Sequence, residues 1–456
     1  MRNWVCRRGS RQRSTAIDGP CGTKAMSVEQ IYWQADDPAE AEQEKAPDRT
    51  DIAVIGAGYT GLSVALHLAR AGRHVVVFEA GGIGAGCSSR NGGMVGPSFH
   101  KLGSAGLIAR YGEAKTLTIM REGIHALDYF EDFVAENALE CDLQMRGRFR
   151  GARTVADYDA MGRETDWLSR NIGLPVAMVP RAEQSQEIGS TFYRGGAVYQ
   201  RDGGIHPRKL LVALAQAARA AGVKIVAHCP VSAMRRDGTE TTLQTAQGAV
   251  TATQVVVATN AYADARTPAM HRRIVAIQTA AVATEALSPQ LMDSLTPKKR
   301  MFGETGRVFM WFRPSPDGRR FIFGGRIGRP GGAVDAQRKA FARSVQRVFP
   351  QLPDVQFTHV WSGNVAYTPD HSPHVGFEDG VWLAGGYCGS GVTRSIYFGM
   401  KLARKILQEK GSDTAFDDLP FHPVPFKPFS GRAASLMTRW YAHLDARDLR
   451  RDHNAG

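Results

Sequence analysis

The chain has 456 residues, which is too long for one ordinary hydrophobic core and indicates two or three domains. Hydrophobic residues make up 43% of it and charged residues 22%, a balance typical of globular proteins that fold in water. The longest apolar tracts, such as Leu210 to Val226, contain charged residues and are too short to cross a bilayer, so no membrane span is expected.

The formal net charge of +13 raises the question of nucleic acid. Part of this charge comes from arginines in residues 1–25, and much of the rest is scattered through amphipathic segments and the region after Phe429. Because no basic stripe with interleaved aromatic residues occurs, we expect no nucleic-acid partner and a preference for anionic small molecules.

The six cysteines form no C-x-x-C pair and no zinc spacing. We therefore expect neither disulfides nor a metal site, and a reducing, cytoplasmic location. Arginines at positions 7, 8, 11 and 13 exclude the apolar run of a secretory signal. We interpret residues 1–49 as a leader that is disordered or that results from an over-extended reading frame, since Met26 also resembles a natural start. Its arginines and serines leave a mitochondrial targeting leader as the alternative.

Residues 51–79 predict a strand, a glycine turn, a helix and a second strand that ends in an acid. In this dinucleotide-binding pattern the first glycine allows the tight turn, the second lets a pyrophosphate approach the backbone, and the third lets the helix pack on the strand. The helix N-terminus then faces the phosphates, and the acid can accept both hydroxyls of an adenosine ribose. The residues predicted to bind the cofactor here are Gly56, Gly58, Tyr59, Thr60, Gly61, Glu79 and Ala80.

The chain then changes character several times. Residues 80–97 are rich in glycine and predict an irregular loop held by a ligand. Two amphipathic helices are predicted at 113–138 and 155–171, α/β character returns from residue 205 to 259, and aromatic strands of a mixed or antiparallel sheet follow between 274 and 325. A last strand begins at residue 381 and a last helix spans 391–409.

A second glycine cluster, residues 385–393, lies between that last strand and last helix. Its glycines let the backbone approach a planar ligand, and the positive end of the helix favours the negative charge that a flavin gains at its N1–C2=O edge on reduction. A packing turn is the structural alternative. The residues predicted to contact the cofactor are Gly386, Gly389, Ser390, Gly391, Val392 and Thr393.

Together these motifs resemble the FAD-dependent D-amino-acid oxidase (DAO) superfamily, and among its members the γ-glutamylputrescine oxidase branch. The likeness extends from about residue 50 to 425. It rests on the first fingerprint with Glu79, the second glycine cluster, and the segments 88–94, 205–210, 255–261 and 361–370.

The resemblance implies an α/β fold with a discontinuous Rossmann-type FAD-binding domain, residues 50–100, 196–270 and 356–425. An inserted α+β substrate domain on a mixed or antiparallel sheet takes residues 101–195 and 271–355, and residues 426–456 form a C-terminal tail. It also implies that Val231 presents its backbone to the adenine, that Thr259 and Asn260 lie where a strand turns past FAD, and that the early loop runs along the isoalloxazine. The loop residues implied are Ser89, Arg90, Asn91, Gly92 and Gly93.

Some members attach FAD covalently through a histidine in the early loop or a cysteine before the sequence matching residues 367–370. This chain has Arg90 and Gly363 at those places, so FAD is expected to be bound without a covalent bond. Sarcosine-oxidase-like members carry a lysine over the flavin for reaction with oxygen, whereas the matching strand here, residues 321–325, has none.

Members of the superfamily remove a hydride from a neutral amine, so the protein has to orient the substrate and exclude water. The catalytic candidates are Tyr367, His371, Arg326 and Tyr387, with Trp311 on the inserted sheet. Arg326, and Arg307 with it, could hold a substrate carboxylate. The structural alternatives are a core position for Trp311 and an exposed turn for His371.

We therefore predict a flavoprotein of polyamine catabolism that oxidises the C–N bond of an amine or amino acid similar to γ-glutamylputrescine to an imine, which water hydrolyses, with O2 as acceptor and H2O2 as product. One alternative is a dehydrogenase of the same fold that acts on an N-methyl amino acid, a D-amino acid or an aminosulfonate and passes electrons to a quinone or carrier. The other is a flavin-binding subunit that is active only in a larger complex.

Overall fold

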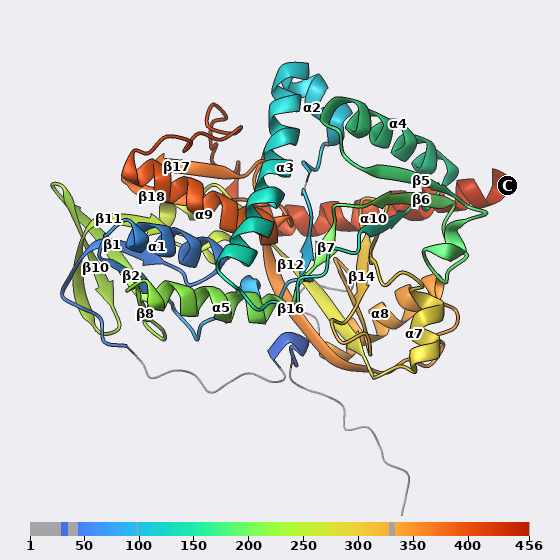
Figure 1. Cartoon of the computed structure of the whole chain (residues 1–456), viewed down its shortest axis with the longest axis horizontal. Helices are drawn as coiled ribbons and strands as arrows, with labels where there is room; N and C mark the ends of the chain where they lie inside the picture. Colours follow the sequence, from blue (N-terminus) through green and yellow to red (C-terminus); the bar gives the residue numbers. More distant parts are fainter. Residues whose placement is uncertain (1–28, 35–43, 98, 328–332, 456) are drawn as a thin grey trace, which may run out of the picture.

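The computed structural model describes residues 29–34, 44–97, 99–327 and 333–455. Their strands form two large sheets, one at each end of the molecule, with helices over the outside (Figure 1). Residues 1–28, most of the expected leader, lie outside the described part.

The first sheet is the dinucleotide-binding half. Its strands run in the order β17, β18, β11, β1, β2 and β8. The strand β10 also pairs with β11, and β9 pairs with β10. The central pairings are parallel, with Val54 opposite Val256 on one side and Val77 on the other. The bounds are β1 (Arg49–Ile55), β2 (Val75–Phe78), β8 (Lys224–Val226), β9 (Val231–Asp237), β10 (Glu240–Thr245), β11 (Gly248–Val257), β17 (His374–Glu378) and β18 (Val381–Gly385).

Helices cover one face of this sheet because each carries an apolar stripe. In α1 (Tyr59–Arg70) the buried residues include Leu62, Leu66 and Val64, which pack in one cluster with Leu210 and Leu214 of α5 (Pro207–Ala220). The helix α9 (Gly391–Leu407) packs directly on α1, where Gly399 lets the Ser63 side chain approach. Together α1, α5 and α9 form one layer of helices over the buried parallel strands.

The second sheet is the inserted domain. Its strand order is β16, β12, β15, β14, β13, β4, β6 and β5, and all pairings are antiparallel except β13 with β4. Phenylalanines fill its core. The bounds are β4 (Arg148–Gly151), β5 (Val176–Pro180), β6 (Gly195–Tyr199), β12 (Val275–Thr284), β13 (Met301–Glu304), β14 (Met310–Pro314), β15 (Phe321–Gly325) and β16 (Phe357–Tyr367).

The remaining elements surround these sheets. The short pair β3 (Met94–Val95) and β7 (Gly203–Gly204) lies between the two halves. The other helices are α2 (Gly103–Tyr111), α3 (Glu113–Glu136), α4 (Val155–Ile172), α6 (Pro268–His271), α7 (Pro289–Leu295), α8 (Val334–Val348) and α10 (Ser430–Ala455). Short 3-10 turns are η1 (Tyr32–Gln34), η2 (Cys87–Ser89), η3 (Gln184–Gln186), η4 (Asn260–Tyr262) and η5 (Lys427–Phe429).

The structure differs from the expected organisation in three details and adds one helix to the C-terminal tail. The strand β16 belongs to the second sheet rather than to the FAD-binding segment 356–425, because it pairs along its length with β12. Likewise β6 pairs with β4 and β5, just inside the expected segment 196–270. The C-terminal tail contains the long helix α10. Within the expected leader, residues 29–34 pack on the folded body, where Trp33 is buried.

Candidate functional site

A glycine cradle joins β1 to α1. Gly56 has φ +107°, a conformation that L side chains rarely adopt, and a Cβ on Gly61 would lie 1.9 Å from the Gly56 carbonyl oxygen. Gly58 is the N-cap of α1 and offers no side chain to cap it. A helix N-terminus without such a cap presents backbone N–H groups to an anionic ligand, so the cradle fits a pyrophosphate.

Glu79 follows β2 at the edge of the same cradle. Its carboxylate accepts the N–H of Ala57 at 2.9 Å and the N–H of Gly81 at 3.1 Å. An ionised carboxylate has room for about four hydrogen bonds, so two sites are left for the hydroxyls of a ribose. The acid thus lies where the sequence predicts it, beside the glycine turn.

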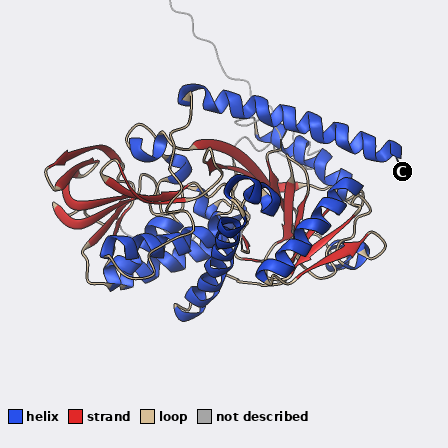
Figure 2. Cartoon of the chain, turned by 90° about the horizontal axis from the view of Figure 1, so that it is seen from above, coloured by secondary structure: helices blue, strands red, loops and turns tan. Residues whose placement is uncertain are grey.

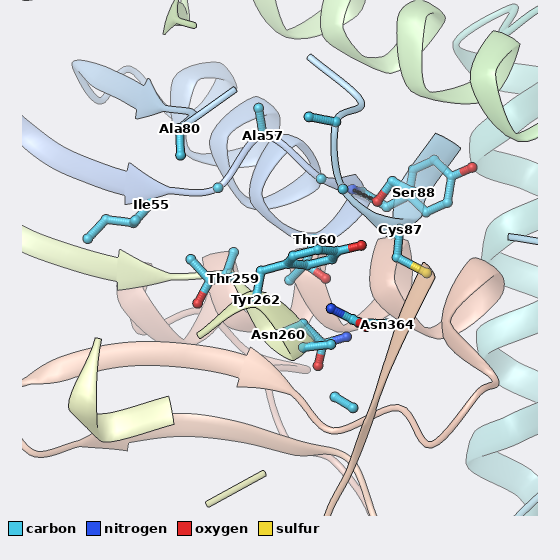
Figure 3. A pocket seen from close by; sticks show the side chains of 18 of the residues that line it. Ile55, Ala57, Thr60, Ala80, Cys87, Ser88, Thr259, Asn260, Tyr262 and Asn364 are labelled. Atoms are coloured by element: carbon cyan, nitrogen blue, oxygen red, sulfur yellow. Dashed lines mark hydrogen bonds between the residues drawn. The ribbon is translucent and has the colours of Figure 1, made fainter. Parts of the chain in front are cut away.

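These residues open into a cavity of about 440 Å³, within the range of small-molecule and cofactor sites (Figure 3). It runs from the cradle past the early loop to the start of α9. Thr259 Oγ1 is buried there without a hydrogen-bond partner among the described residues, as expected of a group that awaits a ligand. The predicted cofactor residues that line the cavity are Gly56, Gly58, Tyr59, Thr60, Glu79, Ala80, Asn91, Val231, Thr259, Asn260, Gly389 and Gly391.

Other predicted cofactor residues shape the site from behind. Ser89 donates to the Gly84 carbonyl and accepts from the Gln34 side chain, so it holds the early loop closed. The Arg90 guanidinium turns away from the cavity and pairs with Glu29 at 3.1 Å. The predicted residues that do not line the cavity are Gly61, Ser89, Arg90, Gly92, Gly93, Gly386, Ser390, Val392 and Thr393.

Several lining residues were not singled out by the sequence. Ser88 accepts the N–H of Tyr59 at 3.1 Å and so ties the early loop to the start of α1. Tyr262 and Asn364 face the cavity from η4 and β16 (Figure 3). Asn364 lies within the family-like segment 361–370 but was not assigned a role, and Tyr262 lies just after segment 255–261. Ser88 could have been found, because it begins the glycine-rich motif that contains Asn91.

Cys87 also lines the cavity, near one of the places where relatives carry a covalent link. Its Sγ lies 3.6 Å from the position that a Cβ would take on Gly363. Burial raises the pKa of the Cys87 thiol to about 11, so the thiol stays protonated near neutral pH and is a poor nucleophile. This favours the predicted non-covalent binding of the cofactor.

The second glycine cluster adopts the geometry that its glycines predict. Gly386 has φ +79° and Gly389 has φ +90°, and α9 begins at Gly391 inside the cavity. Asn260 holds the turn, since its Oδ1 accepts the N–H of Gly386 at 3.0 Å. The positive end of α9 therefore points to the same cavity as that of α1.

A cationic group lies beside Gly389, just outside the set of residues that line the cavity. The Arg326 guanidinium lies 4.6 Å from the centroid of the Tyr367 ring. Lys101 Nζ and Tyr367 Oη each lie 3.9 Å from the position of a Cβ on Gly389. Desolvation, with Arg148, Arg150 and Arg326 nearby, lowers the pKa of the Lys101 ammonium to about 8. Lys101 comes from the turn before α2, so a lysine lies near Gly389 although the strand β15 carries none.

Of the other two catalytic candidates, His371 lies near the cationic group and Tyr387 lies against the cofactor cradle. His371 has φ +62° in a half-buried turn, 6.1 Å from the Tyr367 ring, and burial lowers the pKa of its imidazole. Tyr387 is buried and its hydroxyl lies 2.8 Å from the Thr60 hydroxyl. Tyr387 therefore supports the cofactor cradle, because its hydroxyl is already engaged there.

Two candidates on the inserted sheet have structural contacts. A Cβ on Gly92 would lie 2.7 Å from the Trp311 ring, and one on Gly324 only 1.9 Å from it. Trp311 therefore packs between these glycines, which agrees with its alternative as a core residue. Arg307 pairs with Asp445 and Asp448 of α10 at 2.9 and 2.8 Å. This corrects the suggestion that Arg307 holds a substrate carboxylate.

Comparison with known proteins decides the family. The sequence model described as "FAD dependent oxidoreductase" matches residues 51–405. The chain belongs to this family of FAD-dependent oxidoreductases. FAD is its cofactor, and the cradle, Glu79 and the orphaned Thr259 hydroxyl fit that molecule. A model for pyridine nucleotide-disulphide oxidoreductases also matches residues 7–88, which include the β1–α1–β2 unit.

Curated relatives of this FAD-dependent oxidoreductase cover most of the chain. It is 29% identical to the γ-glutamylputrescine oxidoreductase of Escherichia coli (strain K12), over 82% of the chain and 88% of the relative. It is also 29% identical to the probable oxidoreductase OrdL of Haemophilus influenzae, over 87% and 92%. The crystal structure of glycine oxidase from Geobacillus kaustophilus has the same fold, with a TM-score of 0.68 and 23% identity over 83% of the chain and 99% of that protein.

Among the helices of the described residues, none is long and apolar enough to cross a membrane. Nor do histidine, cysteine and acidic side chains gather anywhere in that part of the chain into a group of three that could hold a metal ion.

Proposed function

We propose that this oxidoreductase acts on an amine or amino acid that carries an anionic group, as γ-glutamylputrescine does, and converts its C–N bond to an imine. The observation that carries the proposal is the cationic group of Arg326 and Lys101 beside Gly389, which lines the FAD cavity. A guanidinium and an ammonium in a partly desolvated site favour a carboxylate by charge-assisted hydrogen bonds. The similarity to a γ-glutamylputrescine oxidoreductase supports the same substrate class.

The same cations select the reactive form of the amine. When bound, FAD supplies the acceptor for the hydride that leaves the substrate carbon. The positive charges of Arg326 and Lys101 disfavour a second cation nearby, so they favour the neutral amine over the ammonium. The amine nitrogen loses a proton to water as the C=N bond forms, and water then hydrolyses the imine to a carbonyl compound and the released amine or ammonia.

We also propose O2 as the acceptor, with H2O2 as the product. Lys101 supports this, because a positive charge beside the cavity stabilises the negative charge that O2 gains on reduction. A dehydrogenase that passes electrons to a quinone or carrier is the alternative, and absence of H2O2 formation under air would favour it. A flavin-binding subunit of a larger complex would show no flavin bleaching by any substrate until its partners are added.

The test is an anaerobic screen in which substrates bleach the oxidised flavin band. Candidate substrates are γ-glutamylputrescine, putrescine, D-amino acids, N-methyl amino acids and aminosulfonates. We expect kcat/KM to be roughly ten- to a hundredfold higher for substrates with an anionic group, as one desolvated charged contact provides. Arg326→Met should remove most of that preference and retain FAD.

The matched control is Arg319→Met, which removes an exposed arginine at the other end of the β14–β15 hairpin. It should leave the preference intact. If the unmodified enzyme oxidises putrescine as efficiently as γ-glutamylputrescine, the proposed carboxylate contact is wrong and Arg326 has a structural role.

A further inference from the structure

The C-terminal helix α10 is oriented with its apolar side chains toward solvent. Leu436 is 65% exposed, Met437 50% and Trp440 58%, and the two phenylalanines just before the helix, Phe426 and Phe429, are also exposed. Large apolar side chains gathered on one surface mark an interaction site, whereas single ones do not. The other face of α10 carries the contacts to the protein.

Carboxylates hold α10 in place. Asp445 is buried and accepts the backbone N–H groups of Arg307 and Val308, and it pairs with the Arg307 and Arg153 guanidinium groups. Asp452 accepts the Val155 N–H at 2.7 Å and pairs with an arginine of the turn before β6. The helix is therefore anchored by polar contacts that do not use its exposed apolar residues.

The outward face has a single periodic stripe. Leu436, Trp440, Arg447 and Arg451 follow one another at steps of four, seven and four residues, which places them along one side of the helix, and Phe429 precedes Leu436 by seven residues in the turn before the helix. The stripe is apolar at its N-terminal half and basic at its C-terminal half. Exposed arginines lie on and beside it, namely Arg432, Arg439, Arg447, Arg450 and Arg451.

The charges on α10 are thus separated by face. Its three acids, Asp445, Asp448 and Asp452, all pair with arginines of the folded body, and Asp448 also contacts Arg447 of the helix itself at 3.7 Å. The outward side is left with Arg432, Arg439, Arg450 and Arg451 among aromatic and aliphatic side chains. Tryptophan and arginine together are typical of helices that lie in the headgroup region of a membrane. The helix runs along the outside of the molecule over its 26 residues, so it can lie flat on such a surface (Figure 2).

We propose that this outward face of α10, with Phe426 and Phe429, docks the protein on the surface of a bilayer that contains anionic lipid. The apolar side chains enter the boundary between headgroups and acyl chains, and the arginines contact lipid phosphates. A second copy of the chain is the less suitable partner, because it would bring the same arginines against each other. The helix lies on the bilayer and does not cross it.

Docking through α10 would bring the cationic group of Arg326 and Lys101 toward the membrane. The segment that Asp445 holds, residues 307–308, leads directly into Phe309, whose ring lies 5.6 Å from Lys101 Nζ at the cationic group. The segment that anchors the helix and the phenylalanine next to Lys101 are therefore one continuous stretch of chain.

The experiment is co-sedimentation of the FAD-loaded, 456-residue protein with vesicles. We expect binding to vesicles of phosphatidylglycerol mixed with phosphatidylcholine, and much weaker binding to phosphatidylcholine alone. Leu436→Ala with Trp440→Ala should weaken binding at least about tenfold. Arg432→Ala with Arg439→Ala should weaken it about fivefold for each arginine removed.

Matched controls use the far end of the molecule. Phe377→Ala removes a 51% exposed phenylalanine from β17, and Arg235→Ala removes an exposed arginine from β9. Both should bind vesicles as the unmodified protein does, and all variants should keep their flavin spectrum. In addition, brominated lipid should quench tryptophan fluorescence of the unmodified protein and quench Trp440→Phe much less.

Two results would overturn the proposal. The first is equal binding to both vesicle types or to neither. The second is a concentration-dependent dimer, seen by light scattering, that the Leu436→Ala and Trp440→Ala pair abolishes while vesicles have no effect. That second result would make the face of α10 an interface between copies.

Discussion

At the scale of single residues, Glu79 has two tasks: its carboxylate holds the backbone of the glycine turn, and it is expected to bind the ribose of FAD. Its carboxylate accepts the N–H groups of Ala57 and Gly81, which shape the turn, and it lines the cavity beside the cradle with two hydrogen-bond sites left for a ribose. A carboxylate with two backbone donors is already fixed in position before the ligand arrives, so little ordering free energy is lost when FAD binds.

We expect Glu79→Ala to weaken FAD binding by roughly 2–4 kcal/mol, because two charge-assisted hydrogen bonds to the ribose are lost. The measurement is the flavin content of the purified protein and titration of the apoprotein with FAD. Asp51→Ala is the control, since Asp51 accepts the His74 N–H at 3.0 Å at the opposite end of the same two strands. Normal FAD content in Glu79→Ala would contradict the ribose assignment.

Lys101 gives a prediction for pH. Although Lys101 is exposed at the surface, desolvation by surrounding protein atoms and neighbouring arginines lower the pKa of its ammonium to about 8. The charge is therefore present below pH 8 and is lost as the pH rises through that value. If this charge assists O2, the rate of flavin reoxidation by O2 should fall above about pH 8. In Lys101→Met the rate should be at least about tenfold lower at neutral pH and should not change across this pH range.

The measurement is the stopped-flow rate at which O2 reoxidises flavin that substrate has already reduced. The rate of flavin reduction by substrate therefore does not enter the result. Lys410→Met, an exposed lysine after α9, is the control and should keep both the rate and its pH profile. Two outcomes would show that this ammonium does not act on O2. One is a reoxidation rate of the unmodified enzyme that does not depend on pH, and the other is a normal reoxidation rate in Lys101→Met.

At the scale of elements, the positive N-terminal end of α9 is expected to stabilise the negative charge of the reduced flavin. A Cβ on Gly391 would meet only ordinary contacts within the protein, the nearest being Tyr387 at 3.6 Å. Gly391→Val should therefore fold, and any effect should come from crowding against FAD at the positive end of the helix. We expect loss of FAD, or a reduction potential lower by roughly 20–40 mV.

The potential is measured by equilibration with a reference dye, and circular dichroism reports the fold. Gly376→Val in β17 is the control, because nothing lies within 4 Å of its Cβ position. A Gly391→Val protein with unchanged potential and activity would show that the second glycine cluster is only a packing turn.

Elements with a local signal could be predicted from the sequence. The glycine turn, Glu79, and the starts of α1 and α9 depend on residues within one β-α unit, where spacing fixes geometry. Lys101 could not be found in this way, because its neighbours Gly389 and Tyr367 lie far away in sequence. Arg307 was misjudged for the same reason, since its partner Asp445 comes 138 positions later.

At the scale of the whole molecule, sheet membership was the harder part to predict. The strand β16 begins the stretch that leads to the second glycine cluster, so its sequence position suggests the FAD-binding domain. Its pairing with β12 instead joins it to the inserted sheet, and its last residue, Tyr367, then reaches the cationic group. One strand thus connects the substrate sheet to the flavin cavity, which only the long-range pairing reveals.

The C-terminal helix is part of this arrangement because of one buried acid. Asp445 joins α10 to Arg153, just before α4, and to residues 307–308, which precede the phenylalanine next to Lys101.

Asp445→Ala leaves Arg153 buried without this partner, so we expect the free energy of unfolding to fall by about 3–5 kcal/mol. The measurement is urea unfolding of the FAD-loaded protein, followed by circular dichroism. The control is Asp166→Ala, which breaks the exposed Asp166–Arg170 pair of α4 and should cost about 1 kcal/mol or less. If Asp445→Ala is as stable as this control, α10 does not contribute to the folded body, and the contacts of Asp445 are not what hold it.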